Sequence, residues 1–248
     1  MADKANDAVP TIEELARFAR APSRGDGGAY YRQLKARLAR HPNDARRLVE
    51  QLLRQSRDVE TRAWAAVVGT EVFGHDFEPT LVALFNGGNA ELQAVALMLL
   101  SELGPAVLQA QLPTLRRKLL KLKDGDDVLQ VMWVIARLRD IGALPAVRQL
   151  ATRPEPYVRE MADVLADYLE NGEAVVLQRI AKHDHEHMVW LCRLAWHLGS
   201  GDALQAIRTC ADSAPDKDCQ KTCAKFARSL ESMRSRREPP FWGVSAPE

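Results

Sequence analysis

The chain has 248 residues, of which 46% are hydrophobic and 27% charged, and these values exclude a chain that is disordered throughout. Its 34 basic and 33 acidic side chains give a net charge of +1, which argues against a dedicated nucleic-acid binder. Because no apolar stretch reaches membrane-spanning length and the N-terminus lacks an apolar signal core, we expect a cytoplasmic protein with no membrane contact.

The N-terminal region is predicted to be a flexible tail over residues 1–9 and a capping helical hairpin over residues 10–42. Thr11 and Glu14 have capping-box spacing for a first helix that runs to about Arg20. A Gly- and Pro-rich loop then leads to a second helix, expected over residues 29–40 and stopped by His41-Pro42.

Six further helical hairpins are predicted over residues 43–233. Their first helices are expected at 44–55, 79–86, 105–122, 143–152, 173–182 and 202–212. Their second helices are expected at 58–73, 89–103, 126–141, 155–171, 184–198 and 216–233. Each second helix starts at an oxygen-bearing side chain suited to a helix N-terminus: Asp58, Asn89, Asp126, Glu155, Asp184 and Asp216. No strand is predicted, because no alternating apolar run lies between turn signals.

A glycine follows five of these second helices and is expected to end each one in a left-handed conformation: Gly74, Gly104, Gly142, Gly172 and Gly199. The glycines are 30, 38, 30 and 27 residues apart, which is typical of a helical-hairpin repeat. We therefore predict an all-α solenoid of about six hairpins, with a C-terminal tail over residues 234–248. The Phe241-Trp242 pair in that tail is either a strap over the last repeat or a peptide for a partner.

The second helices resemble HEAT-type repeats of the armadillo-like superfamily. The resemblance is carried by D-V-E-T-R-A-W-A-A-V-V-G-T-E-V-F-G at 58–74 and by N-A-E-L-Q-A-V-A-L-M-L-L-S-E-L-G at 89–104. It covers about 190 residues, although the 38-residue spacing and the missing glycine in the last repeat depart from the pattern. It implies a right-handed α–α superhelix whose second helices line a concave groove.

Alignment on the glycines gives one polar-tolerant stripe, at positions thirteen, nine, five and two before each glycine. By the resemblance, this stripe is the inner groove. In the third to fifth repeats the stripe includes Trp133, Arg137, Asp163, Asp167, Trp190 and His197. Arg193 lies on the flank of the stripe. The position seven before each glycine is instead apolar and is predicted to face the core: Val67, Leu97, Ile135, Leu165 and Cys192.

These residues favour a non-catalytic scaffold or adaptor that binds a protein or peptide partner in the groove, with no cofactor. Trp133 and Trp190 would be the apolar anchors, and the arginines and aspartates would fix polar groups of the partner. In the alternative interpretation, the tryptophans pack between repeats and the charges pair with one another. The sequence leaves the partner's identity and the oligomeric state open.

Two other resemblances are weaker. Alkyl-purine DNA glycosylases built on HEAT-like repeats use groove tryptophans and an aspartate one turn after a tryptophan, but here those positions hold Arg137 and Leu194. A nucleic-acid partner is therefore the second choice. Bilin-lyase-like chaperones share only the repeat period with this chain.

No catalytic or metal-binding residue is predicted. The run His183-Asp184-His185-Glu186-His187 alternates along a helix start, so its three histidines do not converge. The pair His183 and His187 is four residues apart, but no third ligand is evident. The four cysteines, Cys192, Cys210, Cys219 and Cys223, are expected to be buried reduced thiols, because no ligand set at a metal-site spacing accompanies them. The basic run from Arg116 to Lys123 is expected to cover a solvated outer face.

Overall fold

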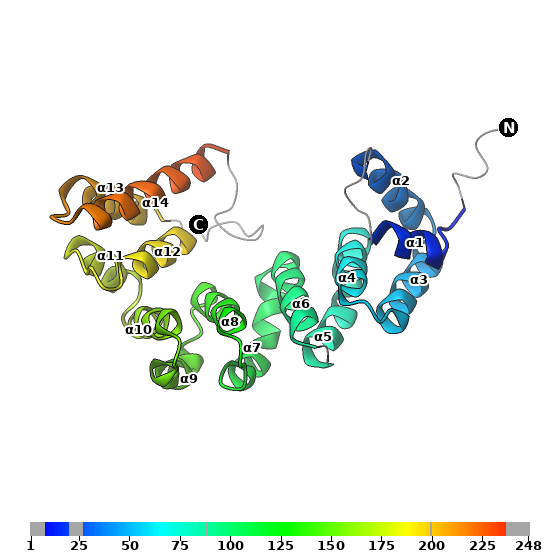
Figure 1. Cartoon of the computed structure of the whole chain (residues 1–248), viewed down its shortest axis with the longest axis horizontal. Coiled ribbons are helices and arrows are strands. Elements are labelled where there is room, and N and C mark those ends of the chain that lie inside the picture. The colour runs from blue at the N-terminus through cyan, green and yellow to red at the C-terminus, as the bar shows by residue number, and fades with distance from the viewer. Residues whose placement is uncertain (1–7, 20–26, 88, 199, 237–248) are drawn as a thin grey trace. The chain divides into compact units, whose positions relative to one another are not determined.

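The computed structural model describes residues 8–19, 27–87, 89–198 and 200–236, with side chains described as far as residue 232, and every regular element in these ranges is a helix (Figure 1). The all-α prediction is confirmed. No helix in the described ranges is long and apolar enough to cross a membrane. Phe241-Trp242 and Gly199 lie outside the described residues.

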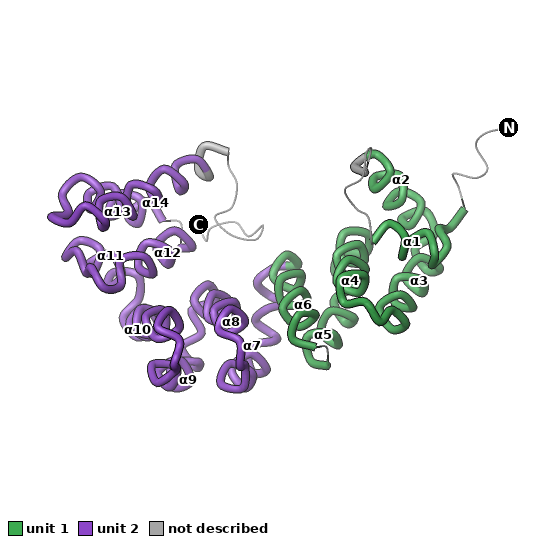
Figure 2. Tube along the Cα trace, in the orientation of Figure 1, with its two compact units in different colours: residues 1–103 green, residues 104–248 purple. Residues whose placement is uncertain are grey.

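The chain divides into two compact units, residues 1–103 and 104–248 (Figure 2). The boundary between them falls between two helices inside the range 43–233, which was predicted to be one repeat array. The helices of unit 1 are α1 (Ile12–Ala19), α2 (Gly27–Arg40), α3 (Pro42–Gln55), α4 (Val59–Phe73), α5 (Glu78–Gly87) and α6 (Ala90–Leu103), with a short 3-10 helix η1 (Gly74–Phe77).

Unit 2 contains α7 (Pro105–Leu119), α8 (Gly125–Arg137), α9 (Leu144–Gln149), α10 (Pro156–Asn171), α11 (Glu173–Ala181), α12 (Met188–Leu198), α13 (Gly201–Ser213) and α14 (Lys217–Arg236), with 3-10 helices η2 (Ile141–Ala143) and η3 (Leu150–Thr152). Each predicted hairpin is present within a few residues. The last helix continues to Arg236, so the tail predicted from residue 234 begins later.

In unit 1 the hairpins α3–α4 and α5–α6 pack side by side, with α4 against α6, and α1 and α2 pack on α4. Phe18 of α1 stacks on Tyr31 of α2, with ring centroids 5.5 Å apart, and lies 5.3 Å from Trp64 of α4. Gly69 allows a close approach in α4, because a Cβ at this position would lie 2.3 Å from the ring of Phe77. The glycine alignment assigned Thr61, Ala65, Gly69 and Val72 of α4 to the groove; the first three are buried and Val72 is partly exposed.

In unit 2 the hairpins α7–α8, α9–α10, α11–α12 and α13–α14 follow one another. Their second helices are neighbours in the order α8, α10, α12 and α14. Helices α8 and α12, two hairpins apart in the sequence, also contact each other. Of the predicted core positions, Leu97, Ile135, Leu165 and Cys192 are buried, whereas Val67 is partly exposed.

Helix capping follows the predicted side chains at most starts. Backbone N–H groups donate to Thr11, Asp58, Asn89 and Asp216, each from three residues further along the chain. As an N-cap, Asp126 is wrong, because Asp124 accepts from the N–H groups of Asp126 and Asp127; as an acidic residue of the first turn of α8, it is confirmed. Glu155 holds the N-cap position of α10 without a side-chain cap hydrogen bond.

The predicted helix start at Asp184 is also wrong. Residues 182–187 form turns, and α12 begins at Met188. His183 takes a positive φ of 57°, which interrupts the helical path between α11 and α12.

Three of the predicted helix-ending glycines have the expected positive φ, namely Gly74, Gly104 and Gly172. Gly142 does not, because α8 has already ended at Arg137 and Arg139 takes the left-handed conformation with φ 44°. Gly142 serves a close approach instead, since a Cβ there would lie 2.5 Å from the guanidinium carbon of Arg116. Arg116 donates from Nε to the buried Asp140 at 2.7 Å, so this member of the basic run is an ion-pair partner.

Candidate functional site

Five of the seven predicted partner-binding residues lie together in unit 2, and we call them the aromatic cluster: Trp133 and Arg137 on α8, and Trp190, Arg193 and His197 on α12. The ring centroid of Trp133 lies 4.2 Å from that of His197 and 6.4 Å from that of Trp190. Because α8 and α12 contact each other, rings from two non-consecutive hairpins form one group. The sequence placed both tryptophans on one stripe and did not predict a contact between their rings.

The two tryptophans differ in burial. Trp190 is 6% exposed, and its Nε1 donates to Oε2 of Glu160 on α10 at 2.9 Å, which satisfies the indole N–H. Trp133 is half-buried. Trp190 is therefore mainly a core residue, and Trp133 offers more of its indole to a ligand.

Two arginines border the rings. The exposed Arg193 lies over the Trp190 ring, with its guanidinium carbon 4.8 Å from the ring centroid, in cation–π geometry. Arg137 is half-buried, and its burial lowers the pKa of its guanidinium. An arginine stays charged in proteins, so both carry positive charge beside an apolar surface.

His197 is held neutral in this setting. Burial, with the nearby charges of Arg193 and Arg137, lowers the pKa of its imidazole to about 3. At neutral pH its ring therefore behaves as an uncharged partner for Trp133, and the positive charge of the cluster comes from the two arginines.

Asp163 and Asp167 lie in a different group. Arg179 of α11 donates to Asp167 at 2.6 Å, to Asp163 at 3.0 Å and to Asp184 at 2.8 Å. His187 lies 3.5 Å from the same Asp163 oxygen and 3.1 Å from Asp184. The guanidinium, with its side chain only 16% exposed, is thus surrounded by carboxylates that tie α10 and the 182–187 turn to α11.

The two aspartates were expected to share a groove with the tryptophans. In the structure both accept from Arg179, whereas the Trp190 indole donates to Glu160 of the same helix α10. Arg179 was missed because a lone arginine on a first helix carries no signal in the sequence.

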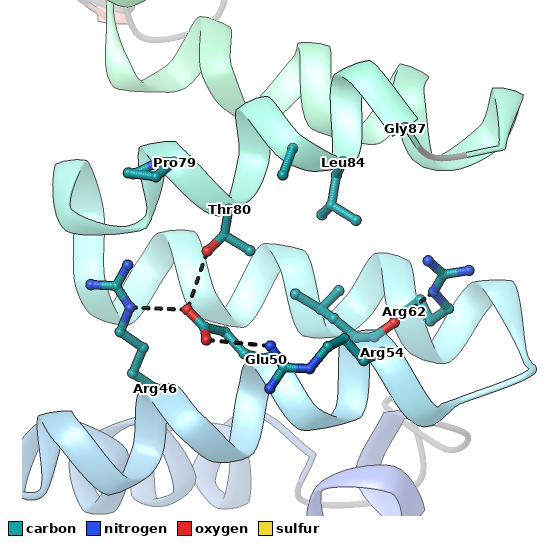
Figure 3. A pocket seen from close by; sticks show the side chains of 10 residues that line it. Arg46, Glu50, Arg54, Arg62, Pro79, Thr80, Leu84 and Gly87 are labelled. Carbon is teal, nitrogen blue, oxygen red and sulfur yellow. Dashed lines mark hydrogen bonds and ion pairs between the residues drawn. The ribbon is translucent and has the colours of Figure 1, made fainter.

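A pocket in unit 1 was also missed (Figure 3). It has a volume of about 530 Å³ and lies between α3 and α5. Glu50 at its centre accepts from Arg46 at 3.1 Å and from Thr80 at 3.3 Å, and lies 3.8 Å from Arg54. The lining has this one carboxylate and three arginines, Arg46, Arg54 and Arg62, so the pocket keeps a net positive charge.

Three of the four cysteines, Cys192, Cys210 and Cys223, gather at the packing of α12, α13 and α14. The buried Sγ of Cys223 lies 2.7 Å from that of Cys210 and 3.7 Å from that of Cys192, and the Met188 sulfur contacts all three thiols. Burial is the main cause that raises the pKa of Cys210 to about 12. These are protonated thiols in a sulfur-rich core, as predicted for buried free cysteines.

Cys219 stands apart from this core and contacts two other metal-ligand side chains. Its Sγ lies 3.3 Å from Nδ1 of His185, and Nε2 of His185 lies 3.7 Å from Asp216. Among the described residues, His185, Asp216 and Cys219 are the group whose ligand atoms all lie within 4.8 Å of one another. Burial and the neighbouring Asp216 raise the pKa of the Cys219 thiol to about 11.

Comparison with models of known protein families gave no match, and no curated protein or solved structure showed significant similarity to the chain. The HEAT-type resemblance therefore rests on the repeat pattern alone.

Proposed function

We propose that the chain is a helical-repeat scaffold or adaptor that binds a protein or peptide partner at the aromatic cluster. The ordered neighbours α8, α10, α12 and α14, and the pair α4 and α6 in unit 1, support a HEAT-like superhelical stacking of hairpins within this proposal. Stacked hairpins of this kind expose extended surfaces that bind macromolecules.

The observation that carries the proposal is the pairing of Trp133 with His197 beside the exposed Arg193. Aromatic and arginine side chains are enriched among the residues that dominate binding energy at protein interfaces. Positive charge beside an indole complements a partner that presents a carboxylate next to an apolar side chain. The partner segment is therefore expected to be acidic and apolar.

A random-peptide display library selected on the whole protein tests this proposal. Enriched peptides should place Asp or Glu beside an aromatic or aliphatic residue. Arg193→Glu should weaken the binding of such a peptide about tenfold or more, which corresponds to about 1.4 kcal/mol. Trp133→Ala should weaken binding by a similar factor, and fluorescence anisotropy with the labelled peptide measures both.

Arg117→Glu is the matched control, because it reverses the charge of an exposed arginine on α7. It should leave the peptide affinity unchanged. Trp190→Ala is unsuited to the test, because removing a buried tryptophan is expected to cost about 3–5 kcal/mol of folding stability. Selection of no peptide, or of peptides whose binding ignores Arg193 and Trp133, would refute the proposal.

The DNA glycosylase alternative requires a carboxylate beside the groove tryptophans. Asp163 and Asp167 bind Arg179, and the carboxylate that contacts Trp190 is Glu160, which accepts its indole N–H. This arrangement gives the alternative less support than peptide binding. Release of an alkylated purine from duplex DNA by the whole protein, and its loss in Glu160→Gln, would favour the enzyme instead.

A further inference from the structure

The hairpin packing of unit 2 brings His185 close to Asp216 and Cys219, two side chains that lie more than thirty residues further along the sequence. His185 lies in the turn between α11 and α12, Asp216 caps the start of α14, and Cys219 is the third residue of α14. Sequence reasoning examined the histidine run and the cysteine pair separately and found too few ligands in each. The structure joins one member of each and adds the capping carboxylate.

We propose that His185, Asp216 and Cys219 form a binding site for a zinc ion. The three donors are an imidazole nitrogen, a carboxylate oxygen and a sulfur, which are the ligand types that Zn²⁺ takes in proteins. Three protein ligands leave the fourth tetrahedral position for water or a group from a partner. This site is independent of the aromatic cluster.

The distances between the donor atoms suit such a centre. Tetrahedral bonds of ordinary Zn–S and Zn–N length separate the sulfur and nitrogen by about 3.5 Å. The Cys219 sulfur and the His185 Nδ1 are 3.3 Å apart, so an ion can bind both after a small movement of the side chains. The carboxylate of Asp216 lies within 4.8 Å of the sulfur and of an imidazole nitrogen, and its Oδ2 is 3.7 Å from Nε2 of His185.

The backbone already fixes two of the three ligands. Asp216 accepts the backbone N–H of Cys219 at 2.7 Å, which holds the carboxylate and the thiol on the same turn at the start of α14. The same Oδ2 of Asp216 lies 3.7 Å from Nε2 of His185. Cys219 lies in the first turn of α14.

Of the three proposed ligands, His185 and Asp216 are accessible to an ion from solvent. The His185 side chain is 67% exposed and that of Asp216 is 38% exposed, whereas Cys219 is 3% exposed. An ion can therefore meet the imidazole and the carboxylate first and then the buried sulfur. As the Zn–S bond forms, the thiol releases its proton to solvent.

Titration of the whole, metal-free protein with Co²⁺ and then Zn²⁺ tests the site. Co²⁺ should bind at one ion per chain and give a thiolate-to-cobalt charge-transfer band, which Zn²⁺ should abolish by displacement. Zn²⁺ should also raise the midpoint of thermal unfolding, because the ion links the 182–187 turn to α14. Cys219→Ser should remove the charge-transfer band, and His185→Gln should weaken Zn²⁺ binding by more than about 100-fold.

Two variants separate this site from its neighbours. His183→Asn changes a histidine of the same turn, and Cys223→Ala removes a thiol of the sulfur-rich core, and neither should alter Zn²⁺ affinity. Asp216→Asn keeps an oxygen acceptor for the helix cap and removes the charge of one proposed ligand. This variant therefore tests the site even if Cys219→Ser loses helicity. Absence of the cobalt band, or a band that survives Cys219→Ser and disappears in Cys223→Ala, would overturn the proposal.

Discussion

At the scale of single residues, His197 links the aromatic cluster to the pH dependence of stability. Its pKa is about 3 in the folded protein, against about 6.5 for an exposed histidine, because burial and the charges of Arg193 and Arg137 disfavour the imidazolium form. Between these two values the unfolded chain binds a proton that the folded chain does not. The contribution of His197 to stability is therefore present above about pH 6.5 and is lost as the pH falls toward 3.

We expect this single residue to remove about 1 kcal/mol of stability for each pH unit below its unfolded pKa. His197→Gln should flatten the decline of the unfolding free energy between pH 6.5 and pH 4, even if its stability at pH 7 is lower. Urea unfolding at several pH values, followed by circular dichroism, measures the slope. His75→Gln, which changes an exposed histidine, should keep the wild-type slope; equal slopes in wild type and His197→Gln would refute the account.

The residue scale also shows which part of the site could be read from the sequence. Trp133, Trp190 and His197 were assigned to one surface because helical spacing placed them on comparable faces, and their rings do meet. The ion pairs of Asp163 and Asp167 could not be read, because their partner Arg179 lies on α11 and its third carboxylate, Asp184, lies in the turn before α12.

At the scale of elements, local signals predicted the helices well except at the end of α8 and at the start of α12. Caps such as Asp58 and Asp216 act on N–H groups three residues away, so a short window of sequence contains the whole interaction. The end of α8 is different, because Arg139 adopts a conformation that glycine usually supplies. The later Gly142 made α8 appear to run to residue 141, whereas it ends at Arg137.

The start of α8 offers a test of capping at the element that carries Trp133. Asp124 accepts the N–H groups of Asp126 at 2.8 Å and of Asp127 at 3.2 Å, so Asp124→Ala should cost about 1 kcal/mol of stability. Asp126→Ala, in the first turn, should cost only about 0.3–0.5 kcal/mol through the helix dipole. Chemical denaturation of the two variants compares these costs.

Asp124→Asn refines the same experiment. An asparagine at this position keeps an oxygen acceptor for the cap and removes a charge that raises the pKa of the Asp127 carboxyl, in addition to burial. We expect its stability to lie within about 0.5 kcal/mol of the wild type. A loss as large as that of Asp124→Ala would show that charge at the helix start, and not the cap hydrogen bond, is the main contribution.

At the scale of the whole molecule, the chemistry described here is concentrated in unit 2. The aromatic cluster, the Arg179 ion pairs and the proposed zinc ligands all lie between residues 104 and 236, whereas the described contacts of unit 1 are mainly those of packed hairpins and the α3–α5 pocket. The boundary at Gly104 falls at a glycine with φ 117°, directly before the proline that begins α7. A cut at this position interrupts no helix.

A fragment of residues 104–248 is therefore expected to fold by itself, unfold cooperatively, and bind both the selected peptide and Co²⁺ as the whole chain does. Its own core includes buried apolar side chains on each of α8, α10, α12 and α14, which satisfies the need of a repeat unit for stacked neighbours. A shorter fragment, 104–198, removes α13 and α14, uncovers Cys192 and deletes two zinc ligands, so it should lose cobalt binding and much of its cooperativity. Circular dichroism melting and cobalt titration of the two fragments decide the matter, and an unfolded 104–248 fragment would show that unit 2 depends on unit 1.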